Sequence, residues 1–89
     1  MLEKDITISN RLGLHARASA KLVQLVNGFE SSVMLVGHGR EVNAKSIMGV
    51  MMLAAGLGNT VTVRADGPDE QAAVEAVADL FERKFDEGG

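Results

Sequence analysis

Hydrophobic side chains alternate with polar ones in two stretches of this chain. In residues 5–9, Ile6 and Ile8 alternate with a threonine and a serine, and in residues 60–65 two valines and an alanine alternate with polar side chains. Successive side chains of a strand point to opposite faces of a sheet, so this period of two predicts two half-buried strands.

A second pair of strands is predicted from the segment between these two. In residues 32–36, the four residues after Ser32 are apolar, so both faces of this strand carry apolar side chains. A Gly-His-Gly turn joins the strand to residues 40–43, in which Val42 is expected to point inward. Glycine accepts the positive φ that a tight hairpin turn requires. His38, at the centre of this turn, is therefore interpreted as a solvated residue rather than as a metal ligand.

Two longer segments have the three-and-four spacing of an amphipathic helix. The first is residues 16–27, ended by Gly28. Its apolar positions are Ala18, Leu22, Leu25 and Val26, and Phe29, just after the glycine, continues the same spacing. The second begins within residues 66–70, where Pro68 suits the first turn and acidic residues suit the positive end of the helix dipole. Its apolar positions are Ala73, Val74, Val77, Leu80, Phe81 and Phe85, and residues 86–89 are expected to fray.

A short helix is predicted after Ser46, whose hydroxyl would cap its first turn. This helix is apolar nearly all round: one stripe is Ile47, Val50, Met51 and Ala54, and Met48 and Met52 point elsewhere. A helix cannot bury every face against one sheet, and exposed apolar side chains usually mark a partner surface. We therefore expect Ile47, Met48 and Met52 to supply part of a docking surface.

The order of elements is strand, helix, strand, strand, helix, strand, helix. With 89 residues the chain has room for one core, so residues 1–89 are expected to form a single domain. Three helices and four strands indicate an α+β protein in two layers, with the helices on one face of the sheet.

Composition excludes several classes of function. The chain has no cysteine, a net charge of −3 and three aromatic residues, all phenylalanine, so neither disulfides, thiolate zinc sites nor a nucleic-acid surface is expected. No stretch has the ~18 apolar residues of a membrane span, and no basic segment leads into an apolar run at the N-terminus. We expect a cytoplasmic protein without membrane insertion, metal or cofactor.

The chemistry of the chain is concentrated at the start of the first helix. His15 lies where backbone amides, among them that of Ala16, are unpaired and where the helix dipole favours an anion. The same field helps to keep the imidazole neutral, which leaves a ring nitrogen free as a nucleophile. Arg17 offers a planar fork of donors to a phosphoryl group. Gly13 lets the chain bend before the site, so these residues form a candidate phosphate carrier.

Two segments resemble the HPr family, the histidine-containing phosphocarriers of the bacterial sugar phosphotransferase system. Residues 13–17, Gly-Leu-His-Ala-Arg, are similar to its active-site stretch, and residues 43–50 are similar to its regulatory-serine region. The resemblance covers nearly the whole chain. It implies an antiparallel sheet in strand order 1-4-2-3 and a monomer that carries phosphate rather than an enzyme.

The same resemblance assigns roles to residues and partners. His15 would accept a phosphoryl group from enzyme I and pass it to sugar-system IIA domains, with Ala16 and Arg17 holding the phosphate. Ser46 would be phosphorylated by an HPr serine kinase/phosphorylase. Partners would dock beside the histidine, on the apolar and basic residues Ile47, Met48, Met51, Met52, Lys21 and Lys45.

Other interpretations remain open from the sequence. A nitrogen-type or purely regulatory branch of the family would share these motifs, and a binding module could use the scaffold with an inert histidine. A small hydrolase is disfavoured, because the sequence shows no activated-water site, no Ser-His-Asp arrangement and no metal set. No second acid–base residue lies near His15 in the sequence, which is consistent with partners that supply the remaining catalytic groups. Ala18 stands where many members have proline, and Gln24 and Asn27 replace frequent basic residues. Acidic partners would then either depend more on Arg17, Lys21 and Lys45 or dock more weakly.

Overall fold

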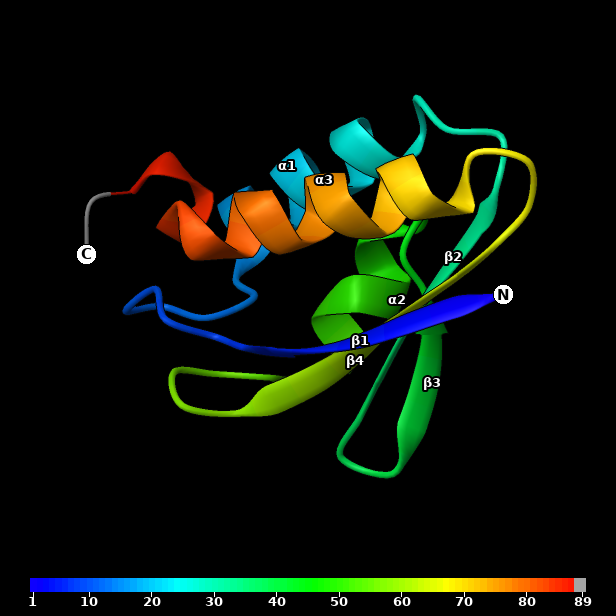
Figure 1. Cartoon of the computed structure of the whole chain (residues 1–89). Helices are drawn as coiled ribbons and strands as arrows, with labels where there is room; N and C mark the ends of the chain where they lie inside the picture. The colour runs from blue at the N-terminus through cyan, green and yellow to red at the C-terminus, as the bar shows by residue number, and fades with distance from the viewer. Residues whose placement is uncertain (88–89) are drawn as a thin grey trace.

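Four antiparallel strands form one sheet in the computed structural model, which describes residues 1–87 (Figure 1). They are β1 (Leu2–Thr7), β2 (Ser32–Gly37), β3 (Arg40–Asn43) and β4 (Thr60–Asp66), and their order across the sheet is β1-β4-β2-β3. The first and last strands of the sequence pattern are therefore neighbours: Leu2 is opposite Ala65, and Thr7 is opposite Thr60. This confirms the fold class and the strand order.

Three helices cover one face of the sheet (Figure 1). They are α1 (Ala16–Val26), α2 (Ile47–Met52) and α3 (Glu70–Glu82), and the short 3-10 helix η1 (Lys84–Asp86) follows α3. Helices α1 and α3 lie side by side, α3 packs over β1 and β4, and α2 packs against α1 and β3. The two-layer architecture expected from the order of elements is thus present.

The core lies between these two layers and is filled by the inward-facing apolar side chains of the strands and helices. Its largest fully buried side chains include Phe81, Phe85, Ile8, Leu22, Leu35 and Leu53. The rings of Phe81 and Phe85 lie 4.8 Å apart at 58°, a tilted arrangement that aromatic pairs favour. Leu25 and Phe29, on the predicted stripe of the first helix, are only half-buried at the edge of this core.

The other face of the sheet is mostly polar, with Met34 and Val36 of β2 half-buried on it, and it carries cross-strand ion pairs. Arg64 on β4 donates to Glu3 on β1 at 2.5 Å and to Glu41 on β3 at 2.6 Å. Thr62 on β4 donates to Asp5 on β1 at 2.7 Å. Glu3 lies directly opposite Arg64 on the adjacent strand, where opposite charges stabilise a sheet modestly, whereas the contact with Glu41 reaches across β2.

The ends of several elements differ from the sequence prediction. Strand β1 begins at Leu2 and ends at Thr7 rather than covering residues 5–9, because pairing with β4 and not alternation sets its length. The charged residues at positions 3–5 do not alternate with apolar ones, so the sequence pattern does not indicate where β1 begins. An edge strand tolerates such exposure on both faces. Helix α2 ends at Met52, and of its expected stripe only Val50 is buried.

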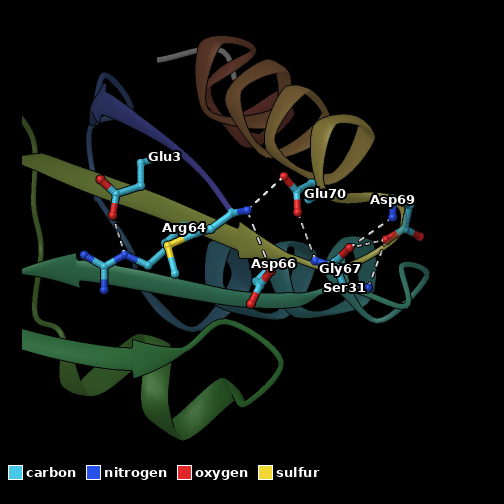
Figure 2. A network of polar contacts seen from close by, with 8 residues as sticks. Glu3, Ser31, Arg64, Asp66, Gly67, Asp69 and Glu70 are labelled. Carbon is cyan, nitrogen blue, oxygen red and sulfur yellow. Dashed lines mark hydrogen bonds and ion pairs between the residues drawn. The ribbon is translucent and has the colours of Figure 1, made fainter.

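Helix α3 begins at Glu70, so Pro68 precedes the helix instead of lying in its first turn. A polar network holds the chain in this turn (Figure 2). Asp69 accepts hydrogen bonds from the hydroxyl and amide of Ser31, at 2.5 and 2.9 Å, and from the amide of Glu30 at 3.0 Å. The N-terminal ammonium lies 3.1 Å from Glu70. The network joins the α1–β2 connection to the start of α3.

Residues 86 and 87 do not fray, contrary to expectation, and residues 88–89 lie outside the described residues. After α3, Lys84, Phe85 and Asp86 all have left-handed backbone angles, with φ of 55°, 55° and 61°. This turn directs the chain back toward α1, and burial of Phe85 and a hydrogen bond from Lys21 to the Phe85 carbonyl (2.6 Å) hold it there. Within residues 1–87, no helix is both long and apolar enough to cross a membrane.

Candidate functional site

The loop between β1 and α1 presents His15, and its shape depends on Gly13. Gly13 has φ of +63°, and a Cβ added there would lie 2.6 Å from the Ala55 carbonyl oxygen and from the Cα of Gly56. The next amide, that of Leu14, donates to the Ala55 carbonyl at 3.0 Å. The loop therefore lies directly on the segment that follows α2, and only glycine fits at its closest approach.

His15 is the N-cap residue of α1, as predicted. Its backbone is extended, with φ of −76° and ψ of 179°, and its side chain makes no capping hydrogen bond. The Ser19 amide donates to the His15 carbonyl at 2.8 Å, and the buried Ser19 hydroxyl donates to the Leu14 carbonyl at 3.1 Å. These bonds fix the backbone on both sides of the histidine and leave its imidazole free for other contacts.

The imidazole of His15 is paired with a carboxylate from the far end of the chain. His15 Nε2 lies 2.5 Å from Glu87 Oε2, and the two side chains are 27% and 14% exposed. Sequence reasoning found no acid–base partner because it considered neighbours in the sequence, whereas these residues are 72 positions apart. No sequence signal marks Glu87, because it lies in a polar C-terminal segment of the kind that usually frays.

A buried asparagine orients this carboxylate. The Nδ2 group of Asn10 donates both to the Gly13 carbonyl, at 2.8 Å, and to Glu87 Oε1, at 3.1 Å. One amide thus ties the carboxylate to the loop that bears His15. Asn10 lies in the loop between β1 and α1, and its complete burial shows that it is a structural part of the site.

The charge state of Glu87 follows from these contacts. Burial by itself would raise the pKa of Glu87, but the hydrogen bonds from Asn10 and His15, together with the charges of His15 and Lys21, outweigh it. The pKa of Glu87 therefore lies below its usual value. The group beside His15 Nε2 is an anionic acceptor.

Arg17 is exposed in the first turn of α1, and its guanidinium makes no hydrogen bond or ion pair with residues 1–87. The preceding residue, Ala16, is exposed as well, and the amides of these two residues make no backbone hydrogen bond in the described part of the chain. The anion cradle expected beside His15 is thus open to solvent, with its donors unused.

Ser46 is the N-cap residue of α2, as predicted. Its exposed hydroxyl accepts a hydrogen bond from the Gly49 amide at 3.1 Å. The two lysines expected at the docking surface are engaged by backbone: Lys45 donates to the Phe29 carbonyl at 2.8 Å, and Lys21 to the Phe85 carbonyl. Both are half-buried, so their ammonium groups have structural roles that the sequence did not indicate.

The apolar side chains of α2 are exposed. Met48 is 75% exposed and Met52 59%, and Ile47 and Met51 are also exposed. Leu12, 68% exposed in the His15 loop, is an apolar residue that sequence reasoning did not select. The sequence does contain a signal for Leu12, because it is an apolar residue in a polar loop, three positions before the histidine.

Comparisons with known proteins agree with this geometry. A family model described as "PTS HPr component phosphorylation site" matches residues 2–83. The phosphocarrier protein HPr of Cupriavidus necator is 61% identical over 88 residues, which cover 99% of each chain.

Two solved structures are similar as well. HPr-C-His from Thermoanaerobacter tengcongensis has a TM-score of 0.94 at 46% identity, covering 98% of each chain. An HPr dimer from the same organism has a TM-score of 0.76 at 46% identity, covering 96% of this chain and 98% of the other. The match over nearly all residues, in sequence and in fold, shows that the chain belongs to the HPr family, the phosphocarrier proteins of the phosphotransferase system.

Proposed function

We propose that His15 is the residue on which this chain carries a phosphoryl group, received from phosphorylated enzyme I and passed to IIA domains. The observation that carries the proposal is the placing of a part-exposed imidazole at the first turn of α1, beside amides and a guanidinium that have no protein partner. A phosphoryl group on the ring would find these donors within the same turn. The role is that of a carrier, with partners supplying the remaining catalytic groups.

The open geometry supports transfer in both directions. A carrier has to present the same nitrogen to a donor and to an acceptor, so a deep pocket would exclude one of them. His15 has about a quarter of its side chain exposed, and Arg17 is exposed beside it. The Nε2 edge of the ring is covered by Glu87, which leaves the Nδ1 edge for the phosphoryl group.

The exposed apolar residues of α2 support a docking surface that adjoins the histidine. The His15 loop rests on Ala55, directly after α2, so Met48, Met52 and their neighbours belong to the same end of the molecule as the site. Leu12 would extend this surface on the loop side. We propose that enzyme I and IIA domains dock here, and that a phosphate on Ser46, at the start of α2, would weaken this docking.

The chain is proposed to act as a monomer. Its docking residues face solvent, and one copy contains every residue of the His15 site. Since an HPr dimer is known among the similar structures, light scattering during size-exclusion chromatography is the direct check. A mass of one chain supports the proposal, and a stable mass of two contradicts it.

The experiment that tests the function is phosphorylation by phosphoenolpyruvate and enzyme I, followed by intact mass measurement. The wild-type chain should gain one phosphoryl group, labile in acid and stable in alkali, because a phosphoramidate hydrolyses when its ring is protonated. His15→Ala should gain none. His38→Ala, which removes the other histidine from an exposed turn, is the matched control and should be labelled normally. Labelling of His15→Ala at the wild-type rate would contradict the proposal.

A further inference from the structure

The contact between His15 and Glu87 distinguishes the two nitrogens of the imidazole. Nε2 lies 2.5 Å from the Glu87 carboxylate, whereas Nδ1 makes no hydrogen bond with residues 1–87. An anionic carboxylate can only accept a hydrogen bond, so a neutral ring facing it carries its proton on Nε2. The lone pair is then on Nδ1, at the uncovered edge of the ring.

We propose that Glu87 is a positioning residue for phosphoryl transfer: it holds His15 in the tautomer whose Nδ1 is the nucleophile and neutralises the ring when Nδ1 carries phosphate. This inference rests on the proposed function of His15 and adds to it a residue from the opposite end of the chain. The relationship between a carboxylate, one ring nitrogen and the reacting nitrogen is the one that orients histidine in many catalytic sites.

The transfer step balances with these groups. The Nδ1 lone pair attacks the phosphorus of the donor's phosphohistidine, and the donor N–P bond breaks with its electron pair returning to the donor ring. The Nε2 proton stays where it is, so the phosphorylated His15 ring carries a positive charge on its two nitrogens. The Glu87 carboxylate, 2.5 Å from Nε2, stabilises that charge. The reverse steps deliver the phosphoryl group to an acceptor.

The structure holds Glu87 in place through a strained turn. Three successive residues, Lys84, Phe85 and Asp86, have left-handed backbone angles, each of which costs about 1–2 kcal/mol in a residue other than glycine. Such strain persists only where the surroundings fix it. Here the Phe85 ring is fully buried, Lys21 donates to the Phe85 carbonyl, and Arg83 binds Asp86 at 2.7 Å.

Charged groups from α1 and η1 lie around the His15–Glu87 pair. Lys21 from α1 lies near Glu87 and lowers the pKa of that carboxyl, while Asn10 from the loop contributes a neutral donor. Arg17 from α1 is exposed, and η1 contributes Asp86, which is paired with Arg83. Glu87 is therefore the one acid in contact with His15 among residues 1–87.

The position of Asn10 makes the substitution Glu87→Gln decisive. Both hydrogens of Asn10 Nδ2 are donated, one to the Gly13 carbonyl and one to Oε1 of Glu87. The carbonyl oxygen of a glutamine would therefore face Asn10, and its NH2 group would face Nε2 of His15. Because NH2 donates, the proton of the neutral ring should move from Nε2 to Nδ1 and block the nucleophile.

Two measurements on Glu87→Gln test the proposal. The first is the ring nitrogen chemical shifts of His15 in the unphosphorylated protein, which report the tautomer and need no partner. The second is the initial rate of labelling by enzyme I and phosphoenolpyruvate. We expect a shift from mainly Nε2–H in the wild type to mainly Nδ1–H in the variant, and labelling slowed by roughly tenfold, since the pair is partly exposed. Glu82→Gln, which removes the same charge from an exposed position at the end of α3, should change neither quantity.

The outcomes separate this proposal from the function on which it rests. An unchanged tautomer, an unchanged rate, or faster labelling of Glu87→Gln would overturn it, the last by showing that Glu87 obstructs the incoming phosphoryl group. A wild-type chain that enzyme I does not label would overturn the proposed function, whatever the tautomer. A wild-type chain that is labelled, with Glu87→Gln inverted in tautomer and slow, supports both.

Discussion

The amide of Leu14 donates to the carbonyl of Ala55, and this 3.0 Å bond fixes the loop of His15 to the end of α2. It joins His15, the proposed nucleophile, to the exposed methionines of α2, which are more than 30 residues away in the sequence. Loss of this contact would separate the proposed phosphate site from the proposed docking surface without changing either set of side chains.

Gly13→Ala should destabilise the protein more than Gly39→Ala. Both glycines have positive φ, +63° and +71°, so both substitutions incur the backbone strain of about 1–2 kcal/mol. Only at Gly13 would the new Cβ lie 2.6 Å from backbone atoms, while at Gly39 nothing lies within 4 Å. Urea unfolding of both variants measures the difference, and equal losses would show that the His15 loop does not need its close approach to Ala55.

Arg17→Ala should slow labelling of His15 by roughly tenfold to a hundredfold, because a charge-assisted hydrogen bond contributes about 1.5–3 kcal/mol. The melting temperature should not change, since the guanidinium is exposed and makes no ion pair with residues 1–87. Arg17→Lys should recover only part of the rate, because lysine lacks the planar fork. Wild-type rates in both variants, measured with enzyme I, would remove Arg17 from the site.

Met48→Asp should weaken binding of enzyme I and leave stability within about 0.5–1 kcal/mol, as is usual for an exposed position. Gln71→Glu adds the same charge at the exposed start of α3, and it should leave binding unchanged. Calorimetric titration with enzyme I gives the affinities. If Met48→Asp instead unfolds the protein, the side chain belongs to the core and not to the docking surface.

Ser46→Asp should slow labelling of His15 by roughly tenfold and keep the melting temperature, because aspartate caps the helix and adds a charge at the docking surface. Ser46→Asn caps without charge and should behave as wild type. Ser46→Ala loses the hydrogen bond from the Gly49 amide and should cost about 1 kcal/mol of stability at an unchanged rate. Equal labelling rates for the aspartate and asparagine variants would restrict Ser46 to a capping role.

Asp69→Asn should lower the melting temperature at neutral pH, and the difference from wild type should disappear in acid. The pKa of Asp69 lies below its ordinary value because its carboxylate accepts hydrogen bonds. The largest effect comes from the Ser31 hydroxyl, and the next largest from the Glu30 amide. A carboxyl with a depressed pKa stabilises the fold fully above about pH 4, and this contribution is lost as the pH falls through the folded pKa. Thermal melts between pH 2 and 7 give the profile.

Glu75→Gln serves as the control for Asp69→Asn, because it removes one exposed carboxylate from α3, the helix that begins directly after Asp69. Its difference from wild type should be small and should not follow the same pH profile. A constant deficit for Asp69→Asn across the whole range would mean that the carboxylate's charge does not stabilise the turn seen in Figure 2.

The sequence by itself determined the elements and their inward faces. Alternation located β4, with Val61 and Val63 buried, and helical spacing located α1 and α3, because burial against one partner layer imposes a period on side chains. The sequence also placed His15 and Ser46 at helix starts, since capping and turn chemistry act over a few residues. Local physics was sufficient for each of these.

Only the tertiary structure decided which distant residues meet. The length of β1 is set by its pairing with β4. Met51 is exposed because a helix of six residues packs only one side against the core, and Val50 occupies that side. The partner of His15 came from a left-handed turn that brings Glu87 back across 72 positions. Such contacts depend on how packed elements direct the chain, and no periodicity in the sequence records them.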